Sequence, residues 1–143
     1  MKFQQTDGGC TQQSERKSDL DCTVRALAIA GRLDYDTAWS IMARSGRLPN
    51  GTGNMLSGLV EAHTQGHIRF EHIEPNYLRF DRWTLAQFAK QNPRGRYIVR
   101  IKGGRGFNHV LALVDGVVCD KQSQHGRHQV KAAWRIYDPL AHL

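Results

Sequence analysis

The stretch His109-Val-Leu-Ala-Leu-Val-Asp-Gly-Val-Val-Cys-Asp120 contains the clearest indication of the fold. Its apolar run at 110–114 is typical of a buried central strand. Asp115-Gly116 is a dipeptide that two-residue β-hairpin turns favour, because both positions need a positive φ. We therefore predict an antiparallel hairpin in which residues 117–120 return beside 110–114.

The register of this hairpin brings a histidine and a carboxylate together. A turn at Asp115-Gly116 sets Leu111 opposite Asp120 and His109 opposite Gln122, and residues two apart on a strand share a face. Asp120 is then a diagonal neighbour of His109, at roughly 7–8 Å between the backbones and within side-chain reach. A carboxylate there can hold the imidazole in one tautomer and stabilise its cation. A slip of one residue would exchange the faces of Asp120 and Gln122, so either is a candidate to orient the histidine.

Outside the hairpin, the apolar periodicity changes from helix-like to strand-like along the chain. Helices are predicted at about 21–30, 35–44, 54–64 and 84–91, and further strands at 67–74, 97–102 and 130–136. A length of 143 residues suits one domain. We expect a single α+β domain over 1–143, with N-terminal helices packed on a C-terminal antiparallel sheet, and with 1–17 as an irregular N-terminal segment.

The cysteine content and the hydropathy exclude several classes of protein. Cys10, Cys22 and Cys119 are widely spaced, and no CxxC motif occurs. This pattern disfavours a disulfide framework or a cysteine-rich zinc module, and we expect no metal or other cofactor. No apolar run approaches the length of a membrane span, and the first residues contain no apolar signal-peptide core. The composition therefore favours a protein of the cytoplasm without membrane contact.

Cys22 is the candidate nucleophile. It lies at the expected start of the first helix, where the helix dipole stabilises a thiolate and lowers the pKa of the thiol. A nearby imidazolium lowers that pKa further. In chain order, Cys22, His109 and Asp120 supply the nucleophile, the base and the orienting group that covalent catalysis by cysteine requires.

Two segments together resemble the papain-like cysteine peptidase superfamily. They are Asp21-Cys22-Thr23-Val24-Arg25-Ala26-Leu27-Ala28 and the 109–120 hairpin, and they are most similar to the bacteriocin-processing, double-glycine leader peptidases. Residues 84–120 also resemble small phage-encoded proteins of papain-like fold. The resemblance implies a papain-like fold and hydrolysis of a peptide or amide bond, with Cys22 as nucleophile, His109 as base and Asp120 as orienting residue. It also implies a protein or peptide substrate, with a phage-encoded protein acting on a host or phage protein as the setting.

The oxyanion-hole residue of that superfamily has no direct counterpart here. The family has a glutamine about six residues before the cysteine, and this chain has Arg16 there. We expect the backbone N–H of Cys22 to supply one donor, with Gln13 or Ser18 as the second. Asn108 and Gln122, which flank the histidine in the predicted hairpin, are further accessory candidates.

The charge distribution supports an alternative function. The net charge of +7 is concentrated in residues 90–135. Alternation on neighbouring predicted strands places four cationic residues on one exposed sheet face: Arg100, Lys102, Lys131 and Arg135. The alternative is a catalytically inactive papain-fold protein that binds an acidic protein or a nucleic acid through this basic face. The sequence leaves the oligomeric state open.

Overall fold

The computed structural model describes residues 1–10, 20–49, 51–74, 83–102 and 108–140. The helices are α2 (Cys22–Gly31), α3 (Tyr35–Arg44), α4 (Met55–Thr64) and α5 (Leu85–Gln91). The strands are β1 (Lys2–Gln5), β2 (Arg69–His72), β3 (Arg96–Lys102), β4 (Asn108–Val114), β5 (Val117–Asp120) and β6 (Val130–Tyr137). Across the described ranges, no helix is both long and apolar enough to cross a membrane.

The strands form one six-stranded sheet in the order β1-β5-β4-β3-β6-β2. Strand β1 runs parallel to β5, and all the other neighbours are antiparallel. The prediction of an antiparallel sheet and of an irregular segment at 1–17 was therefore wrong at β1. This strand is exposed along its whole length, so no apolar pattern announces it. Its backbone pairing with the edge of β5 defines it, and a 2.9 Å hydrogen bond from the N–H of Thr6 to the carbonyl of Asp120 continues that pairing.

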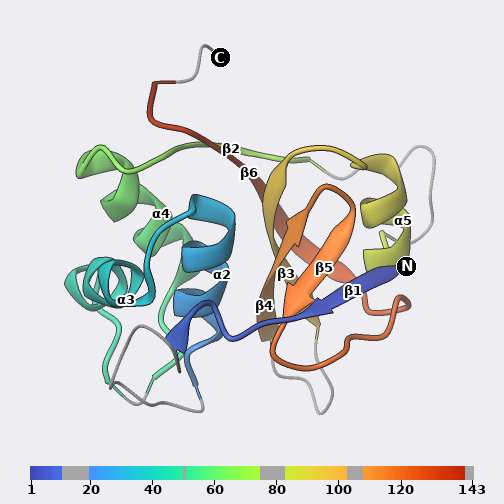
Figure 1. Cartoon of the computed structure of the whole chain (residues 1–143), viewed down its shortest axis with the longest axis horizontal. Coiled ribbons are helices and arrows are strands. Elements are labelled where there is room, and N and C mark those ends of the chain that lie inside the picture. The colour runs from blue at the N-terminus through green and yellow to red at the C-terminus, as the bar shows by residue number, and fades with distance from the viewer. Residues whose placement is uncertain (11–19, 50, 75–82, 103–107, 141–143) are drawn as a thin grey trace.

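Helices cover both faces of the sheet, which gives an α+β architecture of three layers (Figure 1). On one face α2 lies against the sheet, with α3 and α4 outside it, and their apolar side chains pack on residues such as Ile98, Ala112 and Trp134. On the other face α5 packs on residues such as Val99 and Leu113. Both faces of β4 are buried at residues 110–113, as predicted for a central strand, and β3 beside it is also buried on both faces at residues 96–99.

Helix α2 is buried on almost every side, because it lies between the sheet and the outer helices. A helix in this position needs small and apolar residues all round, and its sequence CTVRALAIAG provides them apart from Arg25. Asp21 precedes the helix but does not cap it with its side chain. The Asp21 carboxylate instead forms an ion pair with Arg25 and accepts a 2.6 Å hydrogen bond from the hydroxyl of Tyr35. These contacts fix the start of α2, where Cys22 lies.

The β4–β5 hairpin has the predicted turn and register. Asp115 and Gly116 both have positive φ, at 49° and 78°, as a two-residue turn of this kind requires. Ala112 pairs with Cys119, and this is the last pair of the β4–β5 ladder on the side away from the turn. His109 and Asp120 therefore lie just beyond the paired part of the hairpin.

Candidate active site

The structure brings Cys22, His109 and Asp120 together from three separate elements. Cys22 is the first residue of α2, His109 is near the start of β4, and Asp120 ends β5. Nε2 of His109 lies 2.6 Å from Oδ2 of Asp120. The Cys22 thiol is hydrogen-bonded to the His109 side chain. Because Asp120 occupies Nε2, Nδ1 is the ring nitrogen left for the sulfur. The three groups thus form a continuous Cys–His–Asp chain of hydrogen bonds.

Cys22, His109 and Asp120 meet on the other face of the sheet from the one that simple alternation of side chains predicts. Leu111, which the predicted register puts on the same face as His109 and Asp120, packs in the cluster beside α5. His109 and Asp120 instead contact Cys22 and Arg25, which belong to α2 on the other side of the sheet. The β4–β5 ladder ends at the Ala112–Cys119 pair, before either residue, while His109 remains paired with Ile101 of β3.

The electrostatic environment of Cys22, His109 and Asp120 favours the charged forms of the cysteine and the histidine. Burial raises the pKa of the Cys22 thiol, but the hydrogen bond with His109 and one from the backbone of Val110 outweigh it. The nearby positive charges of His109 and Arg25 act in the same direction, and the net pKa of the thiol is lowered. Burial lowers the pKa of His109, yet its bonds to Asp120 and Cys22 raise this pKa to about 9. Both shifts favour the thiolate–imidazolium form of the pair over the neutral form.

Asp120 is the carboxylate at one end of the Cys22–His109–Asp120 group, and its side chain is almost fully buried. Burial raises the pKa of its carboxyl group, but the bond to His109 and the imidazolium charge outweigh burial, and this pKa is lowered. Oδ1 accepts a 2.8 Å hydrogen bond from the N–H of Lys121 and lies 3.5 Å from a guanidinium nitrogen of Arg25. Oδ2 accepts a 3.0 Å hydrogen bond from Nε2 of Gln124 in addition to its contact with His109. A carboxylate held by three hydrogen bonds and an ion pair has little freedom to turn away from the histidine.

Sequence reasoning missed Gln124 and gave Arg25 no role. Gln124 lies in a polar segment after β5, where nothing in the local pattern distinguishes it from its neighbours. Arg25 does carry a signal, since a charge in an otherwise apolar helix must find a partner when the helix is buried.

The accessory residues are only partly placed. Gln13 and Ser18, the candidates for the oxyanion hole, lie outside the described residues. Asn108 is an exposed residue paired with Lys102 at the open end of β4. Gln122 is also exposed and does not contact His109 through any hydrogen bond that the described structure contains. Asp120, rather than Gln122, holds the histidine.

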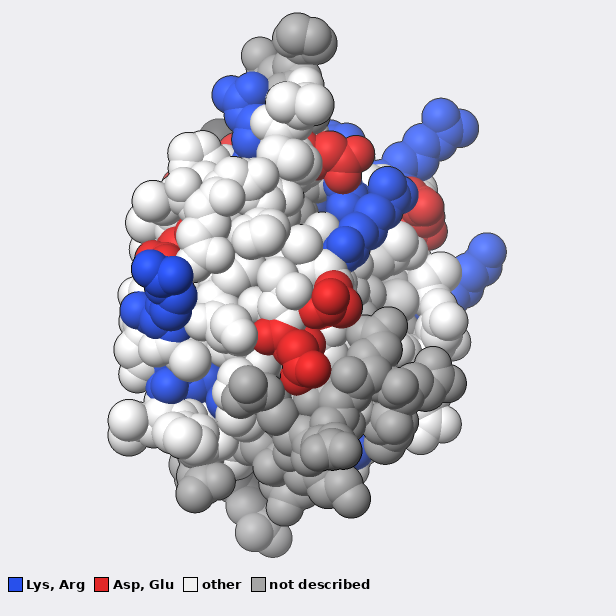
Figure 2. Space-filling model, turned by 60° about the vertical axis from the view of Figure 1, so that its left-hand side comes forward, with Lys and Arg blue, Asp and Glu red and all other residues white. Residues whose placement is uncertain are grey.

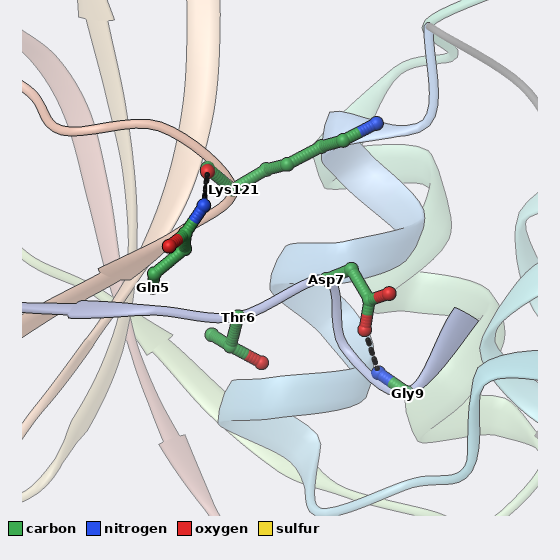
Figure 3. Close-up of a pocket in the computed structure, with 5 residues that line it drawn as sticks. All are labelled: Gln5, Thr6, Asp7, Gly9 and Lys121. Atoms are coloured by element: carbon green, nitrogen blue, oxygen red, sulfur yellow. Dashed lines mark hydrogen bonds between the residues drawn. The ribbon is translucent and has the colours of Figure 1, made fainter. Parts of the chain in front are cut away.

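A pocket of about 370 Å³ opens beside Asp120. It is lined by Arg25, His109, Asp120, Lys121, Gln122 and Gln124, and Cys22 is not part of its wall. A neighbouring hollow of about 440 Å³ lies between the end of β1 and Lys121 (Figure 3). There Nε2 of Gln5 donates to the carbonyl of Lys121, and Oδ1 of Asp7 accepts from the N–H of Gly9. The Gln5–Lys121 bond ties the N-terminal strand to the segment that follows Asp120, and the Asp7–Gly9 bond shapes the turn after β1.

The predicted basic face is not one surface. Arg100 pairs with Ala132, whereas Arg135 pairs with Tyr97, so the two arginines belong to opposite faces of the sheet. The register also shifts between Arg100 and Ile101, and this irregularity breaks the alternation along β6 near Lys131. Lys102 and Lys131 are exposed, while Arg100 and Arg135 are only partly so. The guanidinium of Arg135 instead lies over the aromatic rings of Tyr97 and Tyr137.

On the face that carries α3 and α4, the described residues do not form a continuous basic surface either. Figure 2 shows that side of the molecule, with separate Lys and Arg groups among uncharged surface and acidic groups. Of the residues that the structure describes, none form a cluster of three or more His, Cys, Asp or Glu side chains that could hold a metal ion.

Comparison with known proteins found no matching family model, no matching curated protein and no matching solved structure. The geometry and chemistry of the site itself are therefore what indicate a function.

Proposed function

We propose that this chain is a cysteine hydrolase of papain-like fold that cleaves a peptide or amide bond through a thioester. The observation that carries the proposal is the hydrogen-bonded chain Cys22–His109–Asp120, in which the pKa of the thiol is lowered and that of the imidazole is raised. A buried thiol without a functional partner has a raised pKa, as Cys119 has in this same protein, where burial is the main cause.

Each residue of the chain has a defined step in this reaction. The Cys22 thiolate attacks the carbonyl carbon of the substrate, and the carbonyl oxygen takes the negative charge. The His109 imidazolium then donates its proton to the leaving amine, and a thioester on Cys22 remains. Neutral His109 next takes a proton from a water molecule, whose oxygen attacks the thioester and releases the acid and Cys22. Asp120 keeps the ring oriented throughout and stabilises its cation.

The start of α2 supplies donors for the negative carbonyl oxygen. The first N–H groups of a helix have no partner within it, and the positive end of the helix dipole lies there. The N–H of Cys22 is the donor nearest to the reacting sulfur. An oxyanion donor of this kind contributes on the order of 100–1000-fold to the rate.

The first test is the pH profile of Cys22 alkylation by iodoacetamide. Trypsin separates the three cysteines, because cleavage after Lys17 and Arg25 leaves Cys22 alone in one peptide, so mass spectrometry can follow it individually. We expect the acid limb of the pH–rate profile of Cys22 to have an apparent pKa well below the ordinary thiol value of about 8.5. His109→Ala should move that limb upward, and the matched control His63→Ala, on α4, should not.

A second measurement extends the test from the thiol to catalysis. Release of coumarin from peptidyl amides that end in Gly-Gly should occur with the unaltered protein and stop with Cys22→Ala. An ordinary, His109-independent profile for Cys22 would refute the hydrolase proposal. The inactive binding protein would then be the better explanation, with salt-sensitive association through separate basic residues rather than through one basic face.

A further inference from the structure

Arg25 is a buried charge that the reaction described above does not use. It lies one helical turn after Cys22, and only 7% of it is exposed. A guanidinium in such a place is costly unless anions compensate it. Two carboxylates do so from different elements: Asp21 before α2, and Asp120 at the end of β5.

The charges of this cluster balance in a way that includes the catalytic pair. Asp21 and Asp120 are both buried, at 3% exposure each. One cation, Arg25, lies between them, and the His109 imidazolium is the second cation against Asp120. The Cys22 thiolate is a third anion of the cluster, and Arg47, which is 5% exposed and acts electrostatically on Asp21 and Cys22, is a further cation. With Arg25 and Arg47 in place, protonated His109 completes the set.

The geometry gives Arg25 a connection to both ends of the site. One terminal nitrogen of its guanidinium contacts Asp21, which precedes Cys22 in the sequence and also accepts a hydrogen bond from the Tyr35 hydroxyl. Its other terminal nitrogen lies 3.5 Å from Oδ1 of Asp120, opposite the oxygen that faces His109. A guanidinium can span two carboxylates in this way, and a lysine ammonium, which is a single point charge, cannot do so with the same geometry.

We propose that Arg25 is a positioning residue of the active site: it bridges Asp21 and Asp120, and thereby holds the Asp120 carboxylate ionised and directed at Nε2 of His109. The inference rests on the proposed function, and it adds a link between α2, which carries the nucleophile, and β5, which carries the orienting acid. It predicts that Arg25 controls the ionisation of Cys22 without touching the substrate.

The test is the alkylation profile of Cys22 in Arg25→Met. Loss of the guanidinium removes a positive charge near the sulfur and releases Asp120, and both effects disfavour the thiolate. We expect the acid limb to move up by about one pH unit, which is about a tenfold slower alkylation below both limbs. Arg25→Lys should move the limb in the same direction by less. Arg25→Lys provides the same test if Arg25→Met does not fold.

Arg96→Met is the matched control for general loss of stability. Arg96 is also a buried arginine, with a 2.6 Å ion pair to Asp138 and a 3.0 Å hydrogen bond to the carbonyl of Ala30. It should lower the melting temperature without moving the Cys22 limb. An equal shift in Arg96→Met and Arg25→Met, or an unshifted limb in both Arg25 variants, would overturn the inference.

The route through Asp120 is tested by a double-mutant cycle. If Arg25 acts by holding Asp120, Arg25→Met should move the limb much less in an Asp120→Asn background than in the unaltered protein. Equal shifts in the two backgrounds would overturn this route. The proposed function fails separately, because it requires a perturbed, His109-dependent limb in the unaltered protein, and that limb is measured first.

Discussion

Replacing Asp120 with asparagine removes the charge that faces His109 and keeps the size of the side chain. The pKa of His109 is about 9, against an ordinary value of 6.5, and the bond to Asp120 is the largest of the contacts that raise it. If Asp120 supplied the whole increase, its interaction with the imidazolium would be worth about 3 kcal/mol. Cys22 also contributes. We therefore expect Asp120→Asn to lower the pKa of His109 by at least about one unit.

The same change should alter how stability depends on pH. Because folding raises the pKa of His109, the stabilisation is fully present below 6.5 and is lost as the pH rises through about 9. Because folding lowers the pKa of Asp120, the stabilisation is present above 3.8 and is lost as the pH falls through the lowered value. The free energy of unfolding of the unaltered protein should thus exceed that of Asp120→Asn by the largest amount between about pH 3.8 and 6.5, and by less above pH 9.

Two measurements check this prediction. An NMR titration follows the ring C–H signal of His109, which His109→Gln assigns among the seven histidines. Urea unfolding at about pH 5.5 and about pH 9.5 gives the stability difference. Asp115→Asn, in the turn of the same hairpin, is the control and should leave the titration of His109 unchanged. A His109 that titrates near 6.5 in the unaltered protein, or equally in both proteins, would refute the reasoning.

Three further changes have defined outcomes. Cys22→Ala should abolish product release from any amide substrate and leave the far-ultraviolet circular dichroism unchanged; retained turnover would assign the chemistry to another group. Gln124→Ala removes a 3.0 Å hydrogen bond to Asp120 and should slow hydrolysis by about tenfold, as expected for one bond to a charged group, and an unchanged kcat/KM would contradict this. Gly58→Ala would place a Cβ against Sδ of fully buried Met42 and should destabilise the fold by about 1–3 kcal/mol in urea unfolding, whereas an unchanged midpoint would show that the core yields there.

The elements that local chemistry specifies were predicted from sequence. The Asp115-Gly116 turn fixed the hairpin, and its register follows from that turn alone. Thr84 and Gln87 form a capping box at the start of α5, which begins where the sequence predicts a helix. Asp34 caps α3 by accepting a hydrogen bond from the N–H of Thr37. In each case the signal lies within a few residues of the structure that it specifies.

Features that depend on distant partners were missed or misplaced. Strand β1 exists because the edge of β5, more than a hundred residues later, offers it a backbone partner. The basic residues were assigned to one face because the sequence specifies neither the register between β3 and β6 nor the bulge beside Arg100. The contacts of Arg25 and Gln124 with Asp120 likewise form only when helix, strand and loop converge.

The parallel pairing of β1 with β5 has a consequence for synthesis of the protein. Cys22 and β1, which pairs with the strand that ends at Asp120, leave the ribosome before His109 and Asp120 do. Until they do, the thiol lacks the imidazolium that ionises it, and β1 lacks the strand beside which it lies. If Cys22 is the nucleophile that we propose, its reactivity should therefore appear only when the β4–β5 hairpin joins the sheet. A ribosome-bound fragment that stops before β4 should react with iodoacetamide as an ordinary thiol.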